Sequence, residues 1–379
     1  MNSPGGTADQ QQLAVGDFLP DLRLYDEKGR LNVLGNQVQG KAIVLLAFPS
    51  AQLPGCQQIL RRVGELLPRL SAVAHVFGLS CDTPEDNARH AGLAELAFPI
   101  LADEARDMAR AMGIGHNLGA SDFLGQGAFT CIVADPNQQV IEIHRDLTDA
   151  SFAEPMIQRL EVLAGEEPEL MGRFAPVLVI PRVFDAGLCR RMIEAYESGD
   201  TVETGVLKDD TSGRRKVTED AEIKVRRDHF VRDPGLRQEI AGCLARRVLP
   251  QIHKAFSYRV TRFDDFKIGC YTGERGGHFR PHRDNNNLNA VHRRFAMSLL
   301  LNEAGPGGEQ GGEYEGGYLR FPEFGPQLYR PAAGEAVIFS CSLLHEVLPV
   351  TAGRRYVLLS FLFGEEALQM ARQRASGFG

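Results

Sequence analysis

The sequence predicts a two-domain protein in which an α/β domain is followed by a mainly β domain. Three observations support this prediction. A chain of 379 residues is longer than one ordinary hydrophobic core accommodates. Strand-like and helix-like patterns alternate up to about residue 164, which is typical of a parallel or mixed sheet with helices. From about residue 257 onward, short strand-like runs are separated by turns rich in Gly, Asn and Pro, which is typical of an antiparallel sandwich or barrel.

The elements of the α/β domain follow from hydrophobic periodicity. Residues 41–49, KAIVLLAFP, are almost continuously apolar, which indicates a strand buried on both faces, and a helical period follows at 56–70. The remaining elements are expected in this order: strand 75–82, helix 83–96, strand 98–103, helix 104–113, strands 129–136 and 139–146, and helix 149–165.

The second domain is predicted to begin with a strand at 175–184 and helical stretches near 185–198 and 233–256. Its later strands are expected at 263–272, 293–302, 316–324, 327–340, 345–350 and 353–364. The full division is a disordered lead at 1–14, the α/β domain at 15–164, a polar linker at 165–174, the β domain at 175–366 and a C-terminal tail at 367–379.

Two segments of the second domain are expected to be loops. Glycine is dense at 304–317, which favours a surface loop, and the polar stretch 204–220 is predicted to be a mobile loop. The family resemblance described below implies that the second of these is a candidate lid over a bound substrate.

Composition excludes several classes of function. A net charge of −7 argues against binding nucleic acid or a membrane surface, because no basic excess exists to neutralise phosphates. No apolar run is long enough for a transmembrane helix, and the polar N-terminus lacks a signal-peptide pattern. Seven scattered cysteines without a Cys-x-x-Cys pair fit reduced thiols, so a cytoplasmic location is expected.

The tripeptide His-Arg-Asp occurs twice, at 144–146 and at 282–284. The first copy superficially resembles a kinase catalytic loop, but Ser151 stands where that motif needs Asn, so a structural role is expected there. The second copy lies between two predicted strands. Residues i and i+2 of a strand project to one face, so His282 and Asp284 can point at a common site.

A third ligand is available from a later strand, which carries His345. Two histidines and one carboxylate form the facial triad of non-haem Fe(II) oxygenases, which leaves positions open for a bidentate cosubstrate and O₂. A cosubstrate with a distal carboxylate also needs a buried cation, for which Arg355 is suited. Strand alternation predicts that Arg355 points inward and Arg354 outward.

Residues 175–366 thus resemble the Fe(II)/2-oxoglutarate-dependent oxygenases, specifically the prolyl-4-hydroxylase-like branch. The similarity also includes Tyr271 in CYTGERGGHFRPHRD, the segment GGYLRFP at 316–322, and GEAVIF at 334–339. It implies a double-stranded β-helix (jelly roll) with flanking helices, in which His282, Asp284 and His345 bind iron. It further implies that Arg355 binds the 5-carboxylate of 2-oxoglutarate, with Tyr271 as a second pocket residue.

The chemistry implied by the resemblance is hydroxylation of an unactivated C–H bond, with release of succinate and CO₂. Its cofactors would be Fe(II), 2-oxoglutarate and O₂, with ascorbate as a candidate reductant. Because Arg355 stands where the collagen-type branch has Lys, the substrate stays open among prolyl residues of a protein, free amino acids and a natural-product intermediate. His278 and His292 are expected at the rim, and four nearby arginines form either a solvated edge or a mouth that attracts anions, namely Arg280, Arg283, Arg293 and Arg294.

In the first domain, Cys56 follows a buried strand at the start of a helix, a position that lowers a thiol pKa. Residues 15–164 resemble the peroxiredoxins (AhpC/TSA), which have a thioredoxin-like α/β sandwich. Pro49 and Cys56 match the Pro-x-x-x-Thr/Ser-x-x-Cys motif of that family. Leu53 replaces its hydroxyl residue, and Phe129 aligns with its activating Arg, so two donors that polarise peroxide are missing.

These observations leave several functions open. The main hypothesis is a 2-oxoglutarate-dependent dioxygenase whose first domain is structural, as a degenerate scaffold or a dimerisation unit, or has an accessory redox role. The alternative is a thiol-dependent peroxidase or redox sensor that uses Cys56, with a regulatory oxygenase-like domain, and a third is a non-catalytic interaction protein. The expected partner is a small-molecule, peptide or protein substrate, and both families permit a homodimer.

Overall fold

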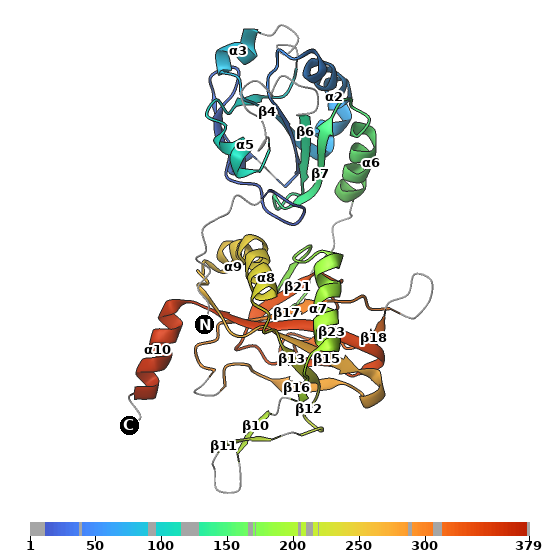
Figure 1. Ribbon diagram of the computed structural model, residues 1–379, viewed down its shortest axis with the longest axis vertical. Coiled ribbons are helices and arrows are strands. Elements are labelled where there is room, and N and C mark those ends of the chain that lie inside the picture. The colour runs from blue at the N-terminus through green and yellow to red at the C-terminus, as the bar shows by residue number, and fades with distance from the viewer. Residues whose placement is uncertain are drawn as a thin grey trace. The chain divides into compact units, whose positions relative to one another are not determined.

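The computed structural model describes residues 12–37, 40–89, 96–114, 129–165, 170, 172–203, 206–209, 215–218, 220–286, 290–305 and 313–376. The chain divides at residue 170 into two compact units (Figure 1). Most of the predicted lead at 1–14, and residues 166–169 and 171 of the predicted linker, lie outside the described residues. Among the described helices, none combines the length and the apolar character that crossing a lipid bilayer requires.

The first unit is built on a mixed five-stranded sheet with the strand order β5-β4-β3-β6-β7. The three strands at one side, β3, β4 and β5, are parallel, and β6 and β7 are antiparallel. The bounds are Ala42–Phe48 for β3, Ala74–Ser80 for β4, Ile100–Ala102 for β5, Phe129–Ala134 for β6 and Val140–Leu147 for β7. The predicted α/β character is therefore confirmed.

Helices and short segments cover both faces of this sheet. On one face, α2 (Pro54–Val73) and α6 (Ala153–Ala164) pack on Val44, Leu46 and Phe48 of β3. On the other face, Ile43, Leu45 and Ala47 pack against side chains from the N-terminal segment. All seven residues of β3 are buried, as its apolar run predicts. Smaller elements are β1 (Arg23–Tyr25), β2 (Leu31–Val33), α1 (Leu34–Gln37), α3 (Pro84–Arg89) and α5 (Asp107–Ala111).

Among its described residues, the second unit contains two large antiparallel sheets and a separate two-stranded one. The larger sheet has the strand order β8-β21-β17-β23-β15-β13-β9, and β14 and β18 also pair with β23. Its strands are β8 (Leu178–Ile180), β9 (Val202–Glu203), β13 (Arg227–Phe230), β14 (Arg262–Phe263), β15 (Lys267–Thr272), β17 (Phe295–Leu300), β18 (Tyr314–Gly316), β21 (Ala336–Ser340) and β23 (Val350–Phe363).

The smaller sheet has the order β12-β16-β22-β19-β20. Its strands are β12 (Lys224–Val225), β16 (His278–His282), β19 (Leu319–Arg320), β20 (Leu328–Tyr329) and β22 (His345–Val347). The two sheets share a core that includes Tyr271 and Val357 from the larger sheet, and Leu319 and Val347 from the smaller one. They therefore pack against each other, and this inner face is where the candidate site lies.

Three helices cover the outer face of the larger sheet (Figure 1). They are α7 (Ala186–Ser198), α8 (Pro234–Arg247) and α9 (Leu249–Phe256). The single helical stretch predicted at 233–256 is wrong in this respect, because the chain forms two helices with a junction at Val248. Pro250 explains the break, since proline lacks the N–H of a continuing helix and is tolerated only in a first turn.

Two regions differ from the predicted loop and tail. Within 204–220, β10 (Val206–Asp209) and β11 (Arg215–Thr218) form an antiparallel pair, and residues 204–205, 210–214 and 219 lie outside the described residues, so the lid stays a prediction. Residues 306–312 of the predicted glycine-rich loop also lie outside them. The predicted tail contains α10 (Glu365–Ser376), whose Ala367 and Leu368 pack on Phe363. A short 3₁₀ turn, η2 (Gly273–Arg275), joins β15 to β16.

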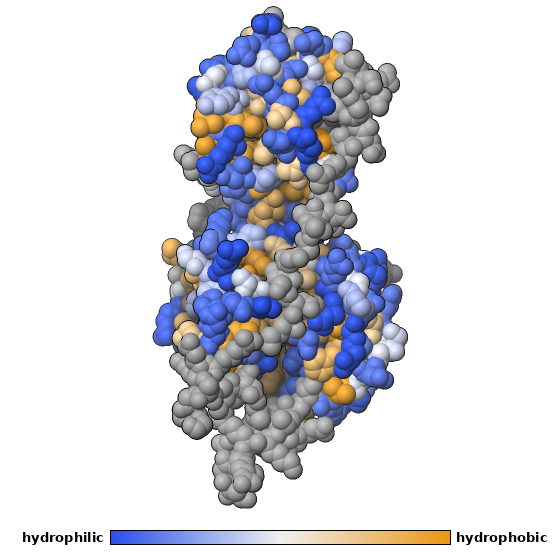
Figure 2. Space-filling model, turned by 60° about the vertical axis from the view of Figure 1, so that its left-hand side comes forward, coloured by the Kyte–Doolittle hydropathy of each residue, from blue (hydrophilic) through white to orange (hydrophobic). Residues whose placement is uncertain are grey.

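Polar side chains dominate the face of the protein shown in Figure 2, and the apolar residues on it form small separate patches. The large apolar side chains that are exposed are spread over many elements, including Tyr25, Leu31, Val162 and Val179. Scattered exposure of this kind is ordinary for a folded domain.

Candidate active site

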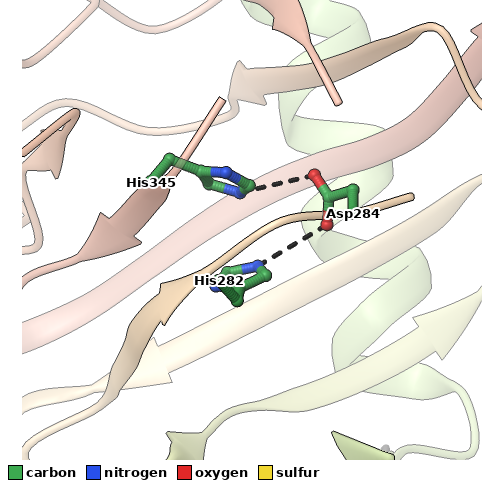
Figure 3. A group of neighbouring side chains, drawn as sticks. All are labelled: His282, Asp284 and His345. Carbon is green, nitrogen blue, oxygen red and sulfur yellow. Dashed lines mark ion pairs between the residues drawn. The ribbon is translucent and has the colours of Figure 1, made fainter. Parts of the chain in front are cut away.

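Three predicted metal ligands come together between the two sheets of the second unit. His282 ends β16, His345 begins β22, and the two are direct cross-strand partners. Ligand atoms of His282, Asp284 and His345 all lie within 4.8 Å of one another (Figure 3). The Nε2 atoms of His282 and His345 lie 3.5 and 3.3 Å from the two carboxylate oxygens of Asp284.

The structure positions Asp284 in a different way from the one predicted. Strand β16 ends at His282, so the i, i+2 rule of a strand does not place the carboxylate. Instead, the backbone N–H of Asp284 donates to the carbonyl of Cys341 at 3.0 Å, which ties this turn to the chain just before His345.

Backbone hydrogen bonds orient both imidazoles. His282 Nδ1 lies 2.8 Å from the carbonyl oxygen of Arg280, and His345 Nδ1 lies 3.1 Å from that of Leu343. Because a carbonyl oxygen only accepts, each Nδ1 carries the hydrogen and each Nε2 keeps its lone pair. Those lone pairs are on the side that faces Asp284, so the pattern is that of metal-binding histidines.

The protonation states also suit a metal site. Burial lowers the pKa of His345, which favours the neutral ring. Burial opposes ionisation of Asp284, but the neighbouring His345 and His282 hold its pKa below the ordinary value. A carboxylate and neutral imidazoles are the forms that bind a metal, and two His with one carboxylate is the donor set of the non-haem Fe(II) triad.

Aromatic rings surround the three ligands. Phe279 stacks on His282 with ring centroids 3.5 Å apart, and Phe339 lies 4.6 Å from the ring of His345. Phe321 lies further away, at 6.2 Å from His345. This apolar lining limits access of water to the ligand atoms.

Arg355 lies on the same inner face as the triad. It is only 3% exposed, and among the described residues no carboxylate lies within ion-pair distance of its guanidinium. Its cross-strand partner is Tyr271 of β15, whose ring centroid lies 5.2 Å from the guanidinium carbon. Arg354 faces the other way and pairs with Glu197 at 3.3 Å, so the predicted alternation is confirmed.

The backbone at Gly317 passes close to the side chain of Arg355, and a glycine at this position leaves room for that side chain. A Cβ atom on Gly317 would lie 2.6 Å from Arg355 Cδ, and this glycine also has a φ of +66°. Both features favour glycine over any other residue. Tyr314 is a second polar neighbour of Arg355. Burial raises the pKa of Tyr314, and a hydrogen bond from Arg355 partly opposes this rise.

Tyr271 is almost fully buried at 1% exposed, and its hydroxyl accepts a hydrogen bond from Arg226 at 3.0 Å. Arg226 also makes two hydrogen bonds to Asp228, at 2.5 and 2.9 Å. Sequence reasoning missed Arg226. The only available signal was the alternation of charged residues in KVRRD (224–228), which reads equally well as an exposed edge.

Arg283, the middle residue of the second His-Arg-Asp, makes its hydrogen bonds outside the triad. It contacts the carbonyl of Ser342 and pairs with Glu323 at 2.6 Å. Glu323 in turn accepts the backbone N–H of Leu344 at 3.0 Å. We call Arg283 and Glu323 the loop clamp, because together they connect the turn after His282 to the turn before His345.

Most arginines of the predicted basic mouth form ion pairs or hydrogen bonds within the protein. Besides the loop clamp, Arg293 pairs with Asp264 at 2.8 Å, and Arg280 donates to the carbonyl of Glu222. The predicted rim residue His292 lies 3.4 Å from Asp264. These contacts favour the interpretation of a structured edge over that of an open anion funnel.

The first unit places Cys56 in the first turn of α2, where it is only 7% exposed. The predicted lowering of its pKa is wrong. Burial raises the pKa of the Cys56 thiol to about 11, and the negative charge of Asp82 adds to this, against a hydrogen bond from the Ser50 backbone. Phe129, at the position of the missing Arg, stacks on Phe48 with centroids 5.6 Å apart and offers no charge.

Comparisons with known proteins match both units to families. Residues 15–143 match the model of the AhpC/TSA family, and residues 266–363 match that of the 2OG-Fe(II) oxygenase superfamily. The chain is 30% identical over 115 residues to "Peroxiredoxin Bcp" of Escherichia coli, covering 30% of this chain and 71% of that protein. It is 28% identical over 129 residues to "Peroxiredoxin bcp1" of Schizosaccharomyces pombe, covering 32% of this chain and 66% of that protein.

Solved structures resemble each unit separately. Peroxidoxin BcpB from Mycobacterium tuberculosis is 22% identical with a TM-score of 0.36, covering 40% of this chain and 99% of that one. A prolyl-4-hydroxylase from Pseudomonas putida is 21% identical with a TM-score of 0.35, covering 50% and 92%. A Trichoplax adhaerens prolyl hydroxylase, in complex with a hypoxia inducible factor peptide fragment, is 16% identical with a TM-score of 0.40, covering 52% and 86%.

Proposed function

Because this chain belongs to the AhpC/TSA family in residues 15–143 and to the 2OG-Fe(II) oxygenase superfamily in residues 266–363, we propose that it is an Fe(II)- and 2-oxoglutarate-dependent hydroxylase with a peroxiredoxin-like accessory domain. The observation that carries the proposal is the convergence of His282, Asp284 and His345 on one point. On the same inner face lies the buried Arg355, which has no carboxylate partner within the described part of the chain. We also infer that the two packed sheets form a double-stranded β-helix.

In the proposed mechanism the residues of this chain bind, orient and shield. His282 and His345 would hold Fe(II) through Nε2, and Asp284 through its carboxylate, with the imidazoles fixed by their Nδ1–H bonds to the backbone. Bound Fe(II) would supply the chemistry that couples oxidative decarboxylation of 2-oxoglutarate to oxidation of a C–H bond.

Arg355 would bind the distal carboxylate of 2-oxoglutarate, since a guanidinium offers paired donors in a plane that matches a carboxylate. The hydroxyl of Tyr271 accepts from Arg226, so its own hydrogen is available to the same carboxylate. Phe279 and Phe339 would keep water from the reacting groups.

The test is succinate release by the full chain with Fe(II), 2-oxoglutarate and a set of candidate substrates. Wild-type protein should form succinate and His282→Ala should form none, because one of three metal ligands is lost. His253→Ala is the matched control, since His253 is an exposed histidine of α9 in the same unit. Wild-type protein that binds Fe(II) but never consumes 2-oxoglutarate would contradict the proposal.

A second candidate function is thiol redox chemistry at Cys56, which the match to peroxiredoxins favours. The raised pKa of Cys56 and the missing donors at Leu53 and Phe129 weigh against fast peroxide reduction. Hydrogen peroxide consumption by wild type and by Cys56→Ser distinguishes the two, because a scaffold domain gives equal rates. If Cys56→Ser also abolishes succinate release, the accessory role of the first unit is wrong.

A further inference from the structure

The strand pairing that supports the metal ligands stops at the ligands themselves. His282 is the last residue of β16, His345 is the first residue of β22, and the register between the two strands shifts just before His282. Asp284 lies beyond the last paired residue of β16. Regular sheet hydrogen bonds therefore do not fix all three ligands. Their geometry also depends on the two flanking turns, 283–286 after β16 and 341–344 before β22.

Two hydrogen bonds connect these turns directly. The backbone N–H of Asp284 donates to the carbonyl of Cys341 at 3.0 Å. The side-chain amide of Asn285 donates to the hydroxyl of Ser342 at 2.8 Å. Neither bond reaches the residue that immediately precedes His345, so the last part of the turn before β22 needs a different contact.

The loop clamp supplies that contact. Arg283 donates to both carboxylate oxygens of Glu323, at 2.6 and 3.2 Å, and also to the carbonyl of Ser342. Glu323 accepts the backbone N–H of Leu344 at 3.0 Å. Two-point pairing of a planar guanidinium with a carboxylate fixes direction as well as distance. Each member of the clamp thus bonds both to the other member and to the turn that leads into β22.

The clamp spans the strand that carries His345. In the smaller sheet, β22 lies between β16 and β19. Arg283 directly follows β16 on one side, and Glu323 lies in the turn after β19 on the other. The pair therefore bridges the start of β22 from both of its neighbours. In sequence, Arg283 stands between two of the ligands, and Leu344, to which the clamp bonds, stands next to the third.

The exposure of the clamp argues against a role in overall stability. The side chains of Arg283 and Glu323 are 39% and 38% exposed. Exposed ion pairs add little to the stability of a fold, because water and salt screen them and two long side chains lose freedom. Placement of metal ligands is a stricter requirement, since they must be held within about 0.5 Å of the productive geometry. A contact that barely stabilises the fold can therefore still decide how well the ligands are placed.

We propose that Arg283 and Glu323 are positioning residues, which hold the turns around His282, Asp284 and His345 so that the ligands are arranged before a metal ion binds. The inference rests on the proposed function, which identifies that ion as Fe(II). Preorganisation strengthens binding, because less conformational freedom is lost when the ion arrives. Partners that orient metal ligands directly contribute about tenfold to a hundredfold in affinity, and the clamp acts through the backbone, so we expect about tenfold.

The sign of the effect distinguishes positioning from simple electrostatics. Arg283 is a cation next to two ligands in sequence, so its charge alone repels a metal ion. If charge were its only influence, Arg283→Met would strengthen metal binding, whereas positioning predicts weaker binding. Glu323→Gln keeps the shape of the side chain and removes a negative charge, so it should weaken binding under either account. Arg283→Met is therefore the decisive variant.

The experiment titrates the metal-free full chain with Mn(II), a stable substitute for Fe(II), and measures free Mn(II) by electron paramagnetic resonance. The dissociation constant should rise about tenfold in Arg283→Met and in Glu323→Gln. The double variant should also show about tenfold, and not a hundredfold, because residues that act as one unit are not additive. Arg191→Met is the matched control, since it breaks an exposed ion pair with Glu239 between α7 and α8 of the same unit, and it should leave the constant unchanged.

The outcomes separate this inference from the function on which it rests. If wild type takes up no Mn(II), the proposed metal site fails. If wild type binds Mn(II) and Arg283→Met binds it equally or more tightly, the clamp does not position the ligands. A hundredfold loss in the double variant would mean that the two residues act separately, which also overturns the inference.

Thermal unfolding of the metal-free variants tests the remaining explanation, a general loss of stability. The unfolding temperature of Arg283→Met and of Glu323→Gln should stay within about 2 °C of wild type, as for loss of an exposed ion pair. A larger fall in both variants would show that the pair stabilises the whole unit, and the positioning role would then be wrong.

Discussion

At the scale of single residues, the most informative side chains are those whose charge is not matched by a neighbour. Arg355 is buried without a carboxylate among the described residues, an arrangement that costs free energy unless an anion binds there. Arg354, one position earlier, is exposed and paired with Glu197. Two adjacent arginines thus differ only in the face of the strand on which they lie, and this decides their roles.

Replacing Arg355 therefore tests the cosubstrate position. Arg355→Met should raise the KM for 2-oxoglutarate by about tenfold to a hundredfold, because one charged hydrogen-bond donor pair is lost. Arg354→Met is the matched control and should leave this KM unchanged. Equal KM values for the two variants in a succinate-release assay would contradict the assignment.

The pKa of the Cys56 thiol is raised, whereas a reactive catalytic thiol needs a lowered pKa. Burial and Asp82 raise its pKa to about 11, so little thiolate exists at neutral pH and its fraction grows only as the pH approaches that value. The rate of alkylation of Cys56 by iodoacetamide, followed by mass spectrometry, should still be rising at pH 10. Asp82→Asn removes a negative charge and should shift the profile to lower pH. A wild-type profile that levels off near pH 8.5, the value of a free thiol, would show that burial is not felt.

At the scale of elements, strand β23 organises the site. It pairs with both β15 and β17, and it places Arg355 opposite Tyr271. The turn that carries Gly317 then passes over Arg355 closely enough that only glycine fits. Two features therefore set the geometry around Arg355: the register of β23 against β15, and the close passage of the backbone at Gly317.

Gly317→Ala should therefore affect both stability and cosubstrate binding. The variant combines a positive φ with a contact of 2.6 Å to Arg355 Cδ, and we expect a loss of about 1–3 kcal/mol in unfolding free energy. Gly276→Ala is the control, since Gly276 has a φ of +59° but no heavy atom near its Cβ position. Both variants should lose stability, but only Gly317→Ala should also weaken binding of N-oxalylglycine.

Sequence patterns predicted the elements whose residues carry their own signal. The apolar run of β3 is one example, because a strand buried on both faces is continuously apolar. The alternation in β23 is another, because neighbouring residues of a strand lie on opposite faces. The break between α8 and α9 has a local signal in Pro250, because proline is tolerated only in the first turn of a helix. The position of Asp284 had none, because a hydrogen bond to Cys341, far along the chain, sets it.

At the scale of the whole molecule, the protein is two units with separate cores. The triad and Arg355 lie in the second unit, and Cys56 lies in the first. The existence of two units was readable from the change in pattern along the chain. The contact of Arg226 with Tyr271 was not, because it joins residues that are far apart in the sequence and are brought together by strand pairing that no local pattern predicts.

Two separate cores predict that ligands act on one unfolding transition only. Calorimetry of the full chain should show one transition that rises by about 5–10 °C with saturating Mn(II) and N-oxalylglycine, and another that does not move. His282→Ala should abolish the rise without altering the other transition. A parallel rise of both transitions would show that the units unfold together.

The loop clamp of Arg283 and Glu323 has a consequence for the order of folding. It closes only when β16 and β22 pair, and these strands are joined by a long intervening stretch of chain that itself forms β17 to β21. Such non-local pairing is entropically slow and follows local structure. Metal uptake should therefore be among the last steps of refolding, which makes it a reporter of the moment at which the second unit is complete.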